Sequence, residues 1–200
     1  MVGLLIRHGH SDAVGRWLAG RRPGVPLNTH GRQEAQGLSE ALRWVPITAV
    51  YSSPLERAVE TATPLATDHG LRVETREALT DLDFGEWTGK TLDELAGVPE
   101  WHAFNAQRRT ACPPGGESLV ALQRRIVNEL IELSHRHAGE VVAIVTHAEP
   151  IRCAIAAFDA RSLDDVLAVE ISPAHVSAVG LGPSLRRVLS VNMRAELAAV

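Results

Sequence analysis

The sequence has few cysteines, no long apolar run and no excess of basic charge, and each absence excludes a class of protein. Its two cysteines, Cys112 and Cys153, lie too far apart for the disulfide framework of a small secreted protein. No apolar stretch approaches the roughly 18 residues of a membrane span, and no basic segment leads into an apolar stretch at the N-terminus, as in a signal peptide. The net charge of −4 argues against a general nucleic-acid binder. We therefore expect a reduced, cytoplasmic protein with neither a membrane nor a nucleic-acid partner.

What remains is the composition of an ordinary globular domain. With 200 residues, of which 45% are hydrophobic, the chain can bury a core of its own. Two stretches rich in glycine and proline, residues 15–26 and 111–117, are typical of loops, and neither separates two self-sufficient halves. We predict one domain over residues 1–200, with an inserted, lid-like segment at about residues 84–117.

Apolar runs and helical periodicities alternate along the chain. Apolar runs predict strands at residues 2–6, 47–51 and 141–145, and two strand-like runs at 175–181 and 186–191, joined by a Gly-Pro-Ser turn. Helices are expected from Asn28 or Thr29 to about Trp44, from Ser53 through Thr61, over residues 118–137 and from about Glu149. This alternation predicts a three-layer α/β/α fold with a mostly parallel sheet covered by helices on both faces.

The second helix carries the strongest local start signal. Ser53 and Glu56 form a Ser-x-x-Glu capping box, and Pro54 occupies the first helical position. Pro64 is expected to kink or end this helix, because proline lacks the backbone donor.

Basic side chains follow three of the predicted strands. Arg7 and His8 end the first strand, His147 follows the strand at 141–145, and Arg57 lies on the helix after the strand at 47–51. Ligands of open α/β sheets bind beyond the carboxyl ends of the strands. We therefore expect these four side chains to converge on one site.

Two chemistries fit such a set. His8 and His10 form a His-x-His pair that could bind zinc, but a catalytic zinc site needs about three protein ligands, and neighbouring arginines disfavour a cation. The favoured alternative is phosphoryl transfer, in which a neutral imidazole attacks phosphorus and carries the phosphoryl group. Arginine forks and a second histidine would stabilise its oxygens, and an acid would protonate the leaving oxygen, with no metal or other cofactor required.

Six motifs in order resemble those of the histidine phosphatase superfamily, which has the phosphoglycerate mutase-like fold. They are "LLIRHGHS" (4–11), "PLNTHGRQEA" (26–35), "VYSSPLERAVETA" (50–62), "LTDLDFGEWTGKTLDEL" (79–95), "PPGGES" (113–118) and "VTHAEPIR" (145–152). An Arg-His-Gly triplet alone would be weak evidence, whereas this ordered series covers most of residues 2–155.

The resemblance implies a role for each matching residue. His8 would be the phosphorylated nucleophile, and Arg7, Arg57 and His147 would hold the phosphoryl oxygens. Asp81 occupies the position of the proton donor, where glutamate is commoner, so Asp83 and Glu86 remain alternatives. Three residues are assigned to substrate binding: Ser11, the backbone amide of Ala148 at a helix start, and Arg21 in the loop at the pocket rim.

Departures from the family pattern help to decide between a phosphatase and a mutase. His10 stands where Glu or Gln is common, and it either shapes the edge of the pocket or takes no part in the chemistry. Val14 replaces an asparagine that contacts the phosphate, and Ala148-Glu149 replaces a glycine pair. Phosphoglycerate mutases of this fold tend to be longer, with a C-terminal tail that guards the intermediate from water, so a chain of 200 residues favours a phosphatase.

The resulting prediction is a phosphoric monoester hydrolase of the histidine acid type, acting on a small phosphorylated substrate through phospho-His8. The alternatives are a mutase of the same fold and a weakly catalytic phospho-ligand binder. The sequence leaves a homodimer open. It also leaves open whether the residues Phe84, Trp87, Trp101 and Phe104 form an apolar lid or only pack, and whether the loop arginines Arg16, Arg21 and Arg22 rim the pocket or are simply solvated.

Overall fold

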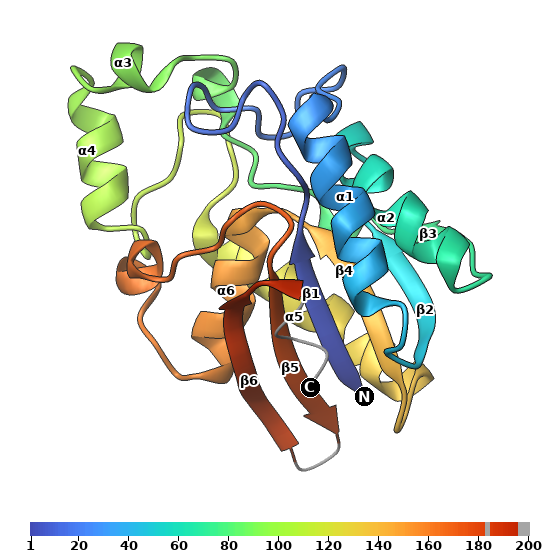
Figure 1. Cartoon of the computed structure of the whole chain (residues 1–200). Coiled ribbons are helices and arrows are strands. Elements are labelled where there is room, and N and C mark those ends of the chain that lie inside the picture. Colours follow the sequence, from blue (N-terminus) through green and yellow to red (C-terminus); the bar gives the residue numbers. More distant parts are fainter. Residues whose placement is uncertain (183–184, 196–200) are drawn as a thin grey trace.

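A six-stranded sheet forms the centre of the computed structural model, which describes residues 1–182 and 185–195 (Figure 1). Its strands lie in the order β3-β2-β4-β1-β5-β6. Strand β5 is antiparallel to both of its neighbours, and the other five strands all run in the same direction. The strands are β1 (Val2–Arg7), β2 (Ile47–Ser52), β3 (Val73–Thr75), β4 (Val141–Thr146), β5 (Val176–Gly182) and β6 (Leu185–Met193). The predicted α/β fold with a mostly parallel sheet is confirmed.

Helices cover both faces of this sheet (Figure 1). On one face, α1 (Thr29–Leu42) and α2 (Glu56–Asp68) form a hydrophobic cluster with Leu4 and Ile6 of β1. On the other face, Leu5 belongs to the cluster that contains the apolar residues of α5 (Leu119–Arg136) and α6 (Ala148–Phe158). Because successive strand residues point to opposite faces and both faces are buried, β1 is apolar at almost every position.

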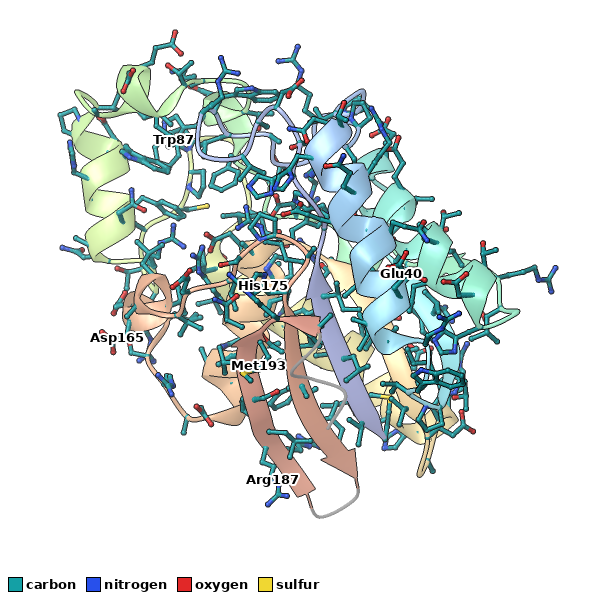
Figure 2. The ribbon with its side chains drawn as sticks, viewed as in Figure 1. Glu40, Trp87, Asp165, His175, Arg187 and Met193 are labelled. Carbon is teal, nitrogen blue, oxygen red and sulfur yellow. The ribbon has the colours of Figure 1, made fainter. Side chains whose placement is uncertain are left out.

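The remaining short elements lie beyond the carboxyl ends of the parallel strands, where Figure 1 shows α3 and α4 above the sheet. They are η1 (Glu77–Leu79), η2 (Gly85–Trp87), α3 (Leu92–Leu95), α4 (Pro99–Ala106) and, later in the chain, η3 (Leu163–Ala168). Three aromatic rings pack this region together: the Trp87 ring stands edge-on to those of Trp101 and Phe104, with centroids 5.4 and 5.5 Å apart (Trp87 is labelled in Figure 2).

The start predicted for the second helix is wrong. Helix α2 begins at Glu56, after Leu55, and no side chain caps it. The Ser53 hydroxyl instead bonds the ring of His147, and a carboxylate oxygen of Glu56 accepts from the amide of Gly24. Tertiary partners thus take both side chains of the predicted capping box. The helix also continues through Pro64 to Asp68 and does not end at the proline.

The other helix starts agree with the local signals. Asn28 caps α1 by accepting from the amide of Gly31, and Ser118 caps α5 by accepting from that of Ala121. Residues 183 and 184 of the predicted Gly-Pro-Ser turn lie outside the described residues. In the part of the chain that the structure describes, no helix is both long and apolar enough to cross a membrane.

Candidate active site

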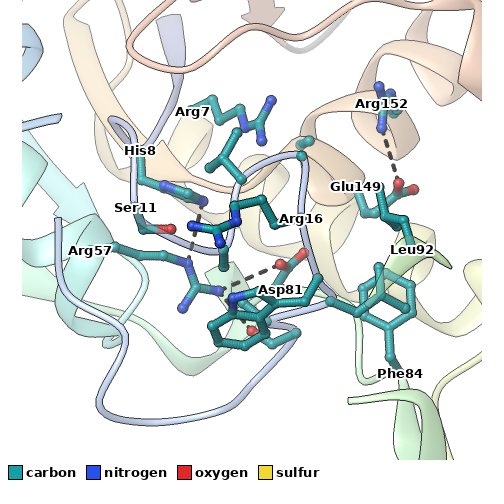
Figure 3. A pocket seen from close by; sticks show the side chains of 18 of the residues that line it. Arg7, His8, Ser11, Arg16, Arg57, Asp81, Phe84, Leu92, Glu149 and Arg152 are labelled. Carbon is teal, nitrogen blue, oxygen red and sulfur yellow. Dashed lines mark hydrogen bonds and ion pairs between the residues drawn. The ribbon is translucent and has the colours of Figure 1, made fainter. Parts of the chain in front are cut away.

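The two histidines predicted to act together lie side by side at the carboxyl ends of β1 and β4. These strands are parallel neighbours, and their register pairs Arg7 with Thr146, so the following residues, His8 and His147, are adjacent. Their ring centroids are 5.1 Å apart. Arg57, in the first turn of α2, reaches the same point from β2, the strand on the other side of β4 (Figure 3).

The hydrogen bonds of His8 place its proton on Nδ1, so that Nε2 is unprotonated and has the lone pair that a nucleophile needs. Its Nδ1 lies 2.7 Å from the carbonyl oxygen of Gly9, an acceptor, so Nδ1 carries the proton. Its Nε2 accepts from Nε of Arg57 at 3.3 Å. Burial and the positive charges of Arg57 and Arg7 hold the pKa of His8 well below its usual value, so the ring is neutral at physiological pH.

His147 is held in the complementary way. Its Nε2 lies 2.8 Å from the Ser53 hydroxyl, which itself accepts from the amide of Leu55 and so can donate to the imidazole. With its proton on Nδ1, a neutral His147 accepts from this hydroxyl and directs Nδ1 toward Oδ2 of Asp81, 3.7 Å away. Burial and the charge of Arg57 lower the pKa of His147 well below its usual value. Ser53 is therefore an orienting residue for His147, a role that sequence reasoning missed.

Several residues next to His8 carry buried polar atoms that have no hydrogen-bond partner. Among the atoms that the structure describes, Nε of Arg7, Oγ of Ser11, Nη1 of Arg57 and Nδ1 of His147 are buried and have no hydrogen-bond partner. All four can donate a hydrogen bond, and a buried donor without an acceptor is costly. The arrangement is that of a preformed site for an oxyanion with several oxygens.

Asp81 is the predicted acid that the structure brings to this site. One carboxylate oxygen accepts from the amide of Leu82, while Oδ2 lies 3.5 Å from Arg57 Nη2 and 3.7 Å from His147 Nδ1. Burial raises the pKa of Asp81 to about 6, although the positive charge of Arg57 opposes this shift. A carboxyl group in this range can both give and take a proton near neutral pH.

The two alternative acids lie elsewhere. Asp83 accepts from the amide of Gly85, and Glu86 is exposed on η2. Neither of them lines the cavity in which His8 and Asp81 lie.

That cavity has a volume of about 420 Å³ and extends well beyond the phosphate-sized space at His8. Ser11 and Ala148, predicted to bind substrate, line this cavity, whereas His147 is fully buried and does not line it. Arg16 also lines it and, within the described part of the chain, its side chain has no hydrogen-bond or ion-pair partner. The sequence left open whether the loop arginines rim the pocket or are simply solvated. Arg16 faces the pocket (Figure 3).

Sequence reasoning missed an ion-paired cluster in the far wall of the cavity. Glu149 accepts from Arg108 at 2.6 Å and from Arg152 at 3.0 Å, and all three residues line the cavity. The signal available was the i,i+3 spacing of Glu149 and Arg152 on the helix that follows His147.

The structure places Arg21, which was predicted to bind substrate, outside the lining of the cavity. Its Nε donates to the carbonyl oxygen of Asp81 and its Nη2 to the carboxylate of Glu117, and it does not line the cavity. Because its guanidinium donates to these two protein acceptors, Arg21 helps to hold the segment that carries Asp81 in place.

His10 points away from the chemistry. Its ring pairs with Glu34 on α1 and does not line the cavity. Within the described residues, the one group of His, Cys, Asp and Glu side chains with metal-binding spacing comprises His10, His30 and Glu34 and excludes His8. The rings of His8 and His10 thus have different partners, the carbonyl oxygen of Gly9 and the carboxylate of Glu34.

Comparisons with known proteins agree on one family. The family model described as the histidine phosphatase superfamily, branch 1, matches residues 4–194. A curated relative, phosphoserine phosphatase 1 of Hydrogenobacter thermophilus, is 27% identical over 97% of this chain and 93% of that protein. A bifunctional protein of Mycobacterium tuberculosis is 37% identical over 74% of this chain, which spans 42% of that longer protein.

Solved structures give the same result. The Bacillus stearothermophilus protein YhfR superposes with a TM-score of 0.90 at 28% identity, covering 96% of each chain. A mycobacterial glucosyl-3-phosphoglycerate phosphatase superposes with a TM-score of 0.84 at 26% identity, covering 96% of this chain and 98% of that one.

Proposed function

Because the chain belongs to branch 1 of the histidine phosphatase superfamily, we propose that it hydrolyses small phosphomonoesters through a phosphohistidine formed on Nε2 of His8. The observation that carries this proposal is the set of four buried, unpartnered donors around that nitrogen. Phosphoryl oxygens would give each donor an acceptor. Since these donors and the neutral imidazole are already in place, little reorganisation is needed before reaction.

The reaction proceeds in two balanced steps. In the first, the Nε2 lone pair forms a bond to phosphorus, the bond to the leaving oxygen breaks with its electron pair, and that oxygen takes a proton from Asp81. In the second, a water molecule gives a proton to Asp81 as its oxygen attacks phosphorus, and the N–P bond breaks to regenerate His8 and release inorganic phosphate. Arg7, Arg57 and His147 stabilise the charge on the phosphoryl oxygens in both steps.

The cavity supports a substrate larger than phosphate itself. Phe84 and Trp101 contribute apolar surface to it from the segment 84–117, which supports a lid-like role for that segment. Arg16 offers an uncommitted guanidinium near the mouth. A phosphomonoester with a flat or apolar leaving group and an additional polar or anionic substituent fits this lining best.

Arg16→Ala is expected to weaken substrate binding and leave chemistry nearly intact. Because Arg16 lines the cavity but is neither the proposed nucleophile nor the proposed acid, KM should rise about tenfold, equivalent to about 1.4 kcal/mol, with kcat within about twofold. Steady-state kinetics on the best substrate measure this. The matched control is Arg43→Ala, which removes an arginine stacked on Trp44 outside the cavity. A large fall in kcat with unchanged KM would contradict this role for Arg16.

The proposed function is tested by supplying a panel of phosphomonoesters in the presence of a chelator. We expect release of inorganic phosphate and, on rapid acid-free quenching, an acid-labile phosphoryl group on His8 detected by peptide mass spectrometry. Activity that disappears with chelator and returns with metal would overturn the metal-independent mechanism. Transfer of phosphate to a second substrate in preference to water would indicate a mutase.

A further inference from the structure

A second cluster of ligating side chains lies on the outer side of the loop that carries His8. His30 and Glu34 lie four residues apart on the same face of α1, and His10 faces them from the loop after β1. One ligand atom from each lies within 4.8 Å of the other two. The family chemistry at His8 uses none of these residues.

Both imidazoles converge on the same oxygen of Glu34. His10 Nδ1 lies 2.7 Å and His30 Nε2 lies 3.3 Å from Oε1, and the two ring centroids are 4.9 Å apart. The other oxygen, Oε2, accepts from the backbone amide of His10 at 2.7 Å. That bond orients the carboxylate so that Oε1 faces the two rings, as an outer-sphere hydrogen bond does in metal sites.

The backbone brings this loop and helix together without any help from an ion. The amide of Asn28 donates to the carbonyl of His10, and a Cβ on Gly9 would lie only 2.7 Å from the carbonyl oxygen of Gly31. Two glycines thus allow the loop to lie directly against the start of α1. His10 is held in place opposite His30 before any ligand binds.

We propose that His10, His30 and Glu34 form a binding site for a zinc-type divalent cation. Two imidazoles and one carboxylate are ligands that zinc accepts, and they disfavour magnesium or calcium, which prefer oxygen ligands. Neighbouring ligands of a tetrahedral ion with bonds of about 2.0–2.1 Å lie roughly 3.3 Å apart. The His30–Glu34 separation already has this value, and the His10–Glu34 pair must open by about 0.6 Å. His30 is 64% exposed, so water can take the fourth position.

Zinc titration of the full chain, stripped with chelator, tests this site. We expect one equivalent to bind by calorimetry and to raise the Tm, because a ligand that binds only the folded state stabilises it. His30→Ala should weaken binding at least about tenfold and abolish the Tm shift. His30 is exposed and pairs only with Glu34 in the described structure, so this variant is expected to fold.

Three further variants test whether any loss of zinc binding is specific to this site. His8→Ala removes an imidazole of the catalytic site, and His135→Ala removes an exposed histidine of α5; both should bind zinc like the wild type. His10→Gln provides a second loss of a ligand. Equal zinc affinity in wild type and His30→Ala, or loss of binding in His8→Ala, would overturn the proposal.

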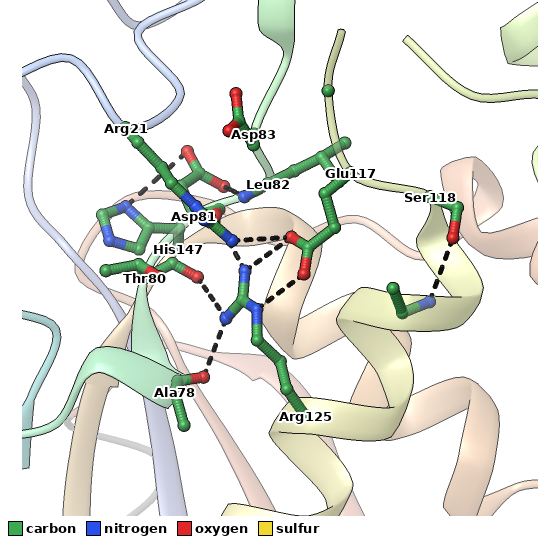
Figure 4. Close-up of polar contacts among 12 residues, drawn as sticks. Arg21, Ala78, Thr80, Asp81, Leu82, Asp83, Glu117, Ser118, Arg125 and His147 are labelled. Carbon is green, nitrogen blue, oxygen red and sulfur yellow. Dashed lines mark hydrogen bonds and ion pairs between the residues drawn. The ribbon is translucent and has the colours of Figure 1, made fainter.

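A separate network holds the segment that carries Asp81. Arg125 of α5 donates to three carbonyl groups of that segment: Nη1 to Ala78 and Thr80, and Nη2 to Asp81, each at 2.8 Å (Figure 4). A single side chain thereby fixes the backbone on both sides of the Thr80–Asp81 peptide bond.

Glu117 orients this arginine and joins it to a second one. Its carboxylate accepts from Nε and Nη2 of Arg125, both at 2.9 Å, and from Nη2 of Arg21 at 2.9 Å. Arg21 in turn donates from Nε to the carbonyl of Asp81 at 3.0 Å. The backbone oxygen of the acid therefore receives two guanidinium donors, both held by one carboxylate (Figure 4).

From this network we infer that Arg125, Glu117 and Arg21 are positioning residues for the proton donor; the inference rests on the proposed function. They touch no substrate, because they hold Asp81 through its main chain and do not line the cavity. Aspartate has a shorter side chain than glutamate. A fixed backbone is therefore needed to keep its Oδ2 near the reacting oxygen.

Leaving groups of different acidity test this inference. Measured as kcat/KM, which reports phosphorylation of His8 and not the later attack of water, Arg125→Ala should lower the rate by about 100-fold for an alkyl phosphate, whose leaving oxygen needs a proton. The loss should be less than about threefold for 2,4-dinitrophenyl phosphate, whose leaving oxygen does not need one. Arg125→Lys should recover little, since an ammonium cannot bond three carbonyls and a carboxylate in fork geometry. Arg124→Ala, which removes the exposed neighbour, is the matched control.

Asp81→Asn, assayed with the same two substrates, separates the claim that Asp81 is the proton donor from the claim that Arg125 positions it. If Asp81→Asn shows the leaving-group effect and Arg125→Ala does not, the positioning role of Arg125 is wrong, and Asp81 remains the proton donor. If neither variant shows it, Asp81 is not the proton donor. An equal loss on both substrates in Arg125→Ala would indicate general disruption and would also overturn the positioning role.

Discussion

His8→Ala is expected to abolish phosphate release, with kcat lower by about four orders of magnitude or more. Removal of a covalent nucleophile eliminates the pathway through the phosphoenzyme, and only the electrostatic part of the site remains. The acid-labile phosphoryl group should disappear at the same time. Phosphate release in single-turnover and steady-state assays, with peptide mass spectrometry, measures both losses.

The same variant should still bind an oxyanion. Arg7, Arg57, Ser11 and His147 all remain, so vanadate or phosphate should bind within about tenfold of the wild-type affinity. This result would separate loss of the nucleophile from collapse of the site. His135→Ala, on the exposed end of α5, is the control for loss of a histidine as such. Activity of His8→Ala near the wild-type level would show that the nucleophile lies elsewhere.

Asp81→Asn is expected to have the second largest effect, and one that depends on the leaving group. The amide matches the carboxyl group in shape and cannot transfer the proton, so kcat for alkyl phosphates should fall by about 10²–10⁴-fold. Hydrolysis of 2,4-dinitrophenyl phosphate should slow far less in the first step. Burst kinetics with this substrate would show rapid phosphorylation of His8 followed by slow hydrolysis, since activation of water also uses Asp81.

The pH dependence of the wild type provides an independent check of this acid. With the pKa of Asp81 raised to about 6, its protonated fraction falls about tenfold for each pH unit above that value. Turnover limited by departure of an alkoxide should therefore decline with unit slope as pH rises beyond about 6. His8 and His147 have lowered pKa values, so both stay neutral through this range. The decline should be absent in Asp81→Asn, and its persistence there would assign it to another group.

Much of this protein could be predicted from the sequence because its fold depends on local patterns. Buried parallel strands need continuous apolar runs, and residues 2–6 and 141–145 have them; helix α5 needs one apolar stripe and a cap, and Ser118 and the residues after it provide both. Since the carboxyl ends of parallel neighbours meet at one edge, the convergence of His8, Arg57 and His147 follows from the same patterns.

The tertiary structure decided which partner each remaining polar side chain takes. Ser53 satisfies every local rule for a helix cap, yet it bonds His147, 94 residues away. Arg21 occupies the loop at the pocket, yet it holds the backbone of Asp81, and Arg16 from the same loop faces the cavity instead.

The position of the acid and the pairing of residues in the far wall of the cavity also could not be read from the sequence. Three carboxylates lie close together in sequence at Asp81, Asp83 and Glu86, and the structure brings Asp81 into the cavity. The pairing of Glu149 with Arg108 spans 41 residues. The sequence by itself thus predicted the strands whose carboxyl ends meet at the sheet edge, and it placed His8 there together with Arg57 and His147. Only the tertiary structure decided which of the three carboxylates lies in the cavity, which side chains hold His147 and Asp81, and which residues form the pocket wall. The physical reason is that a long polar side chain can reach several acceptors, and distant segments of the chain supply them.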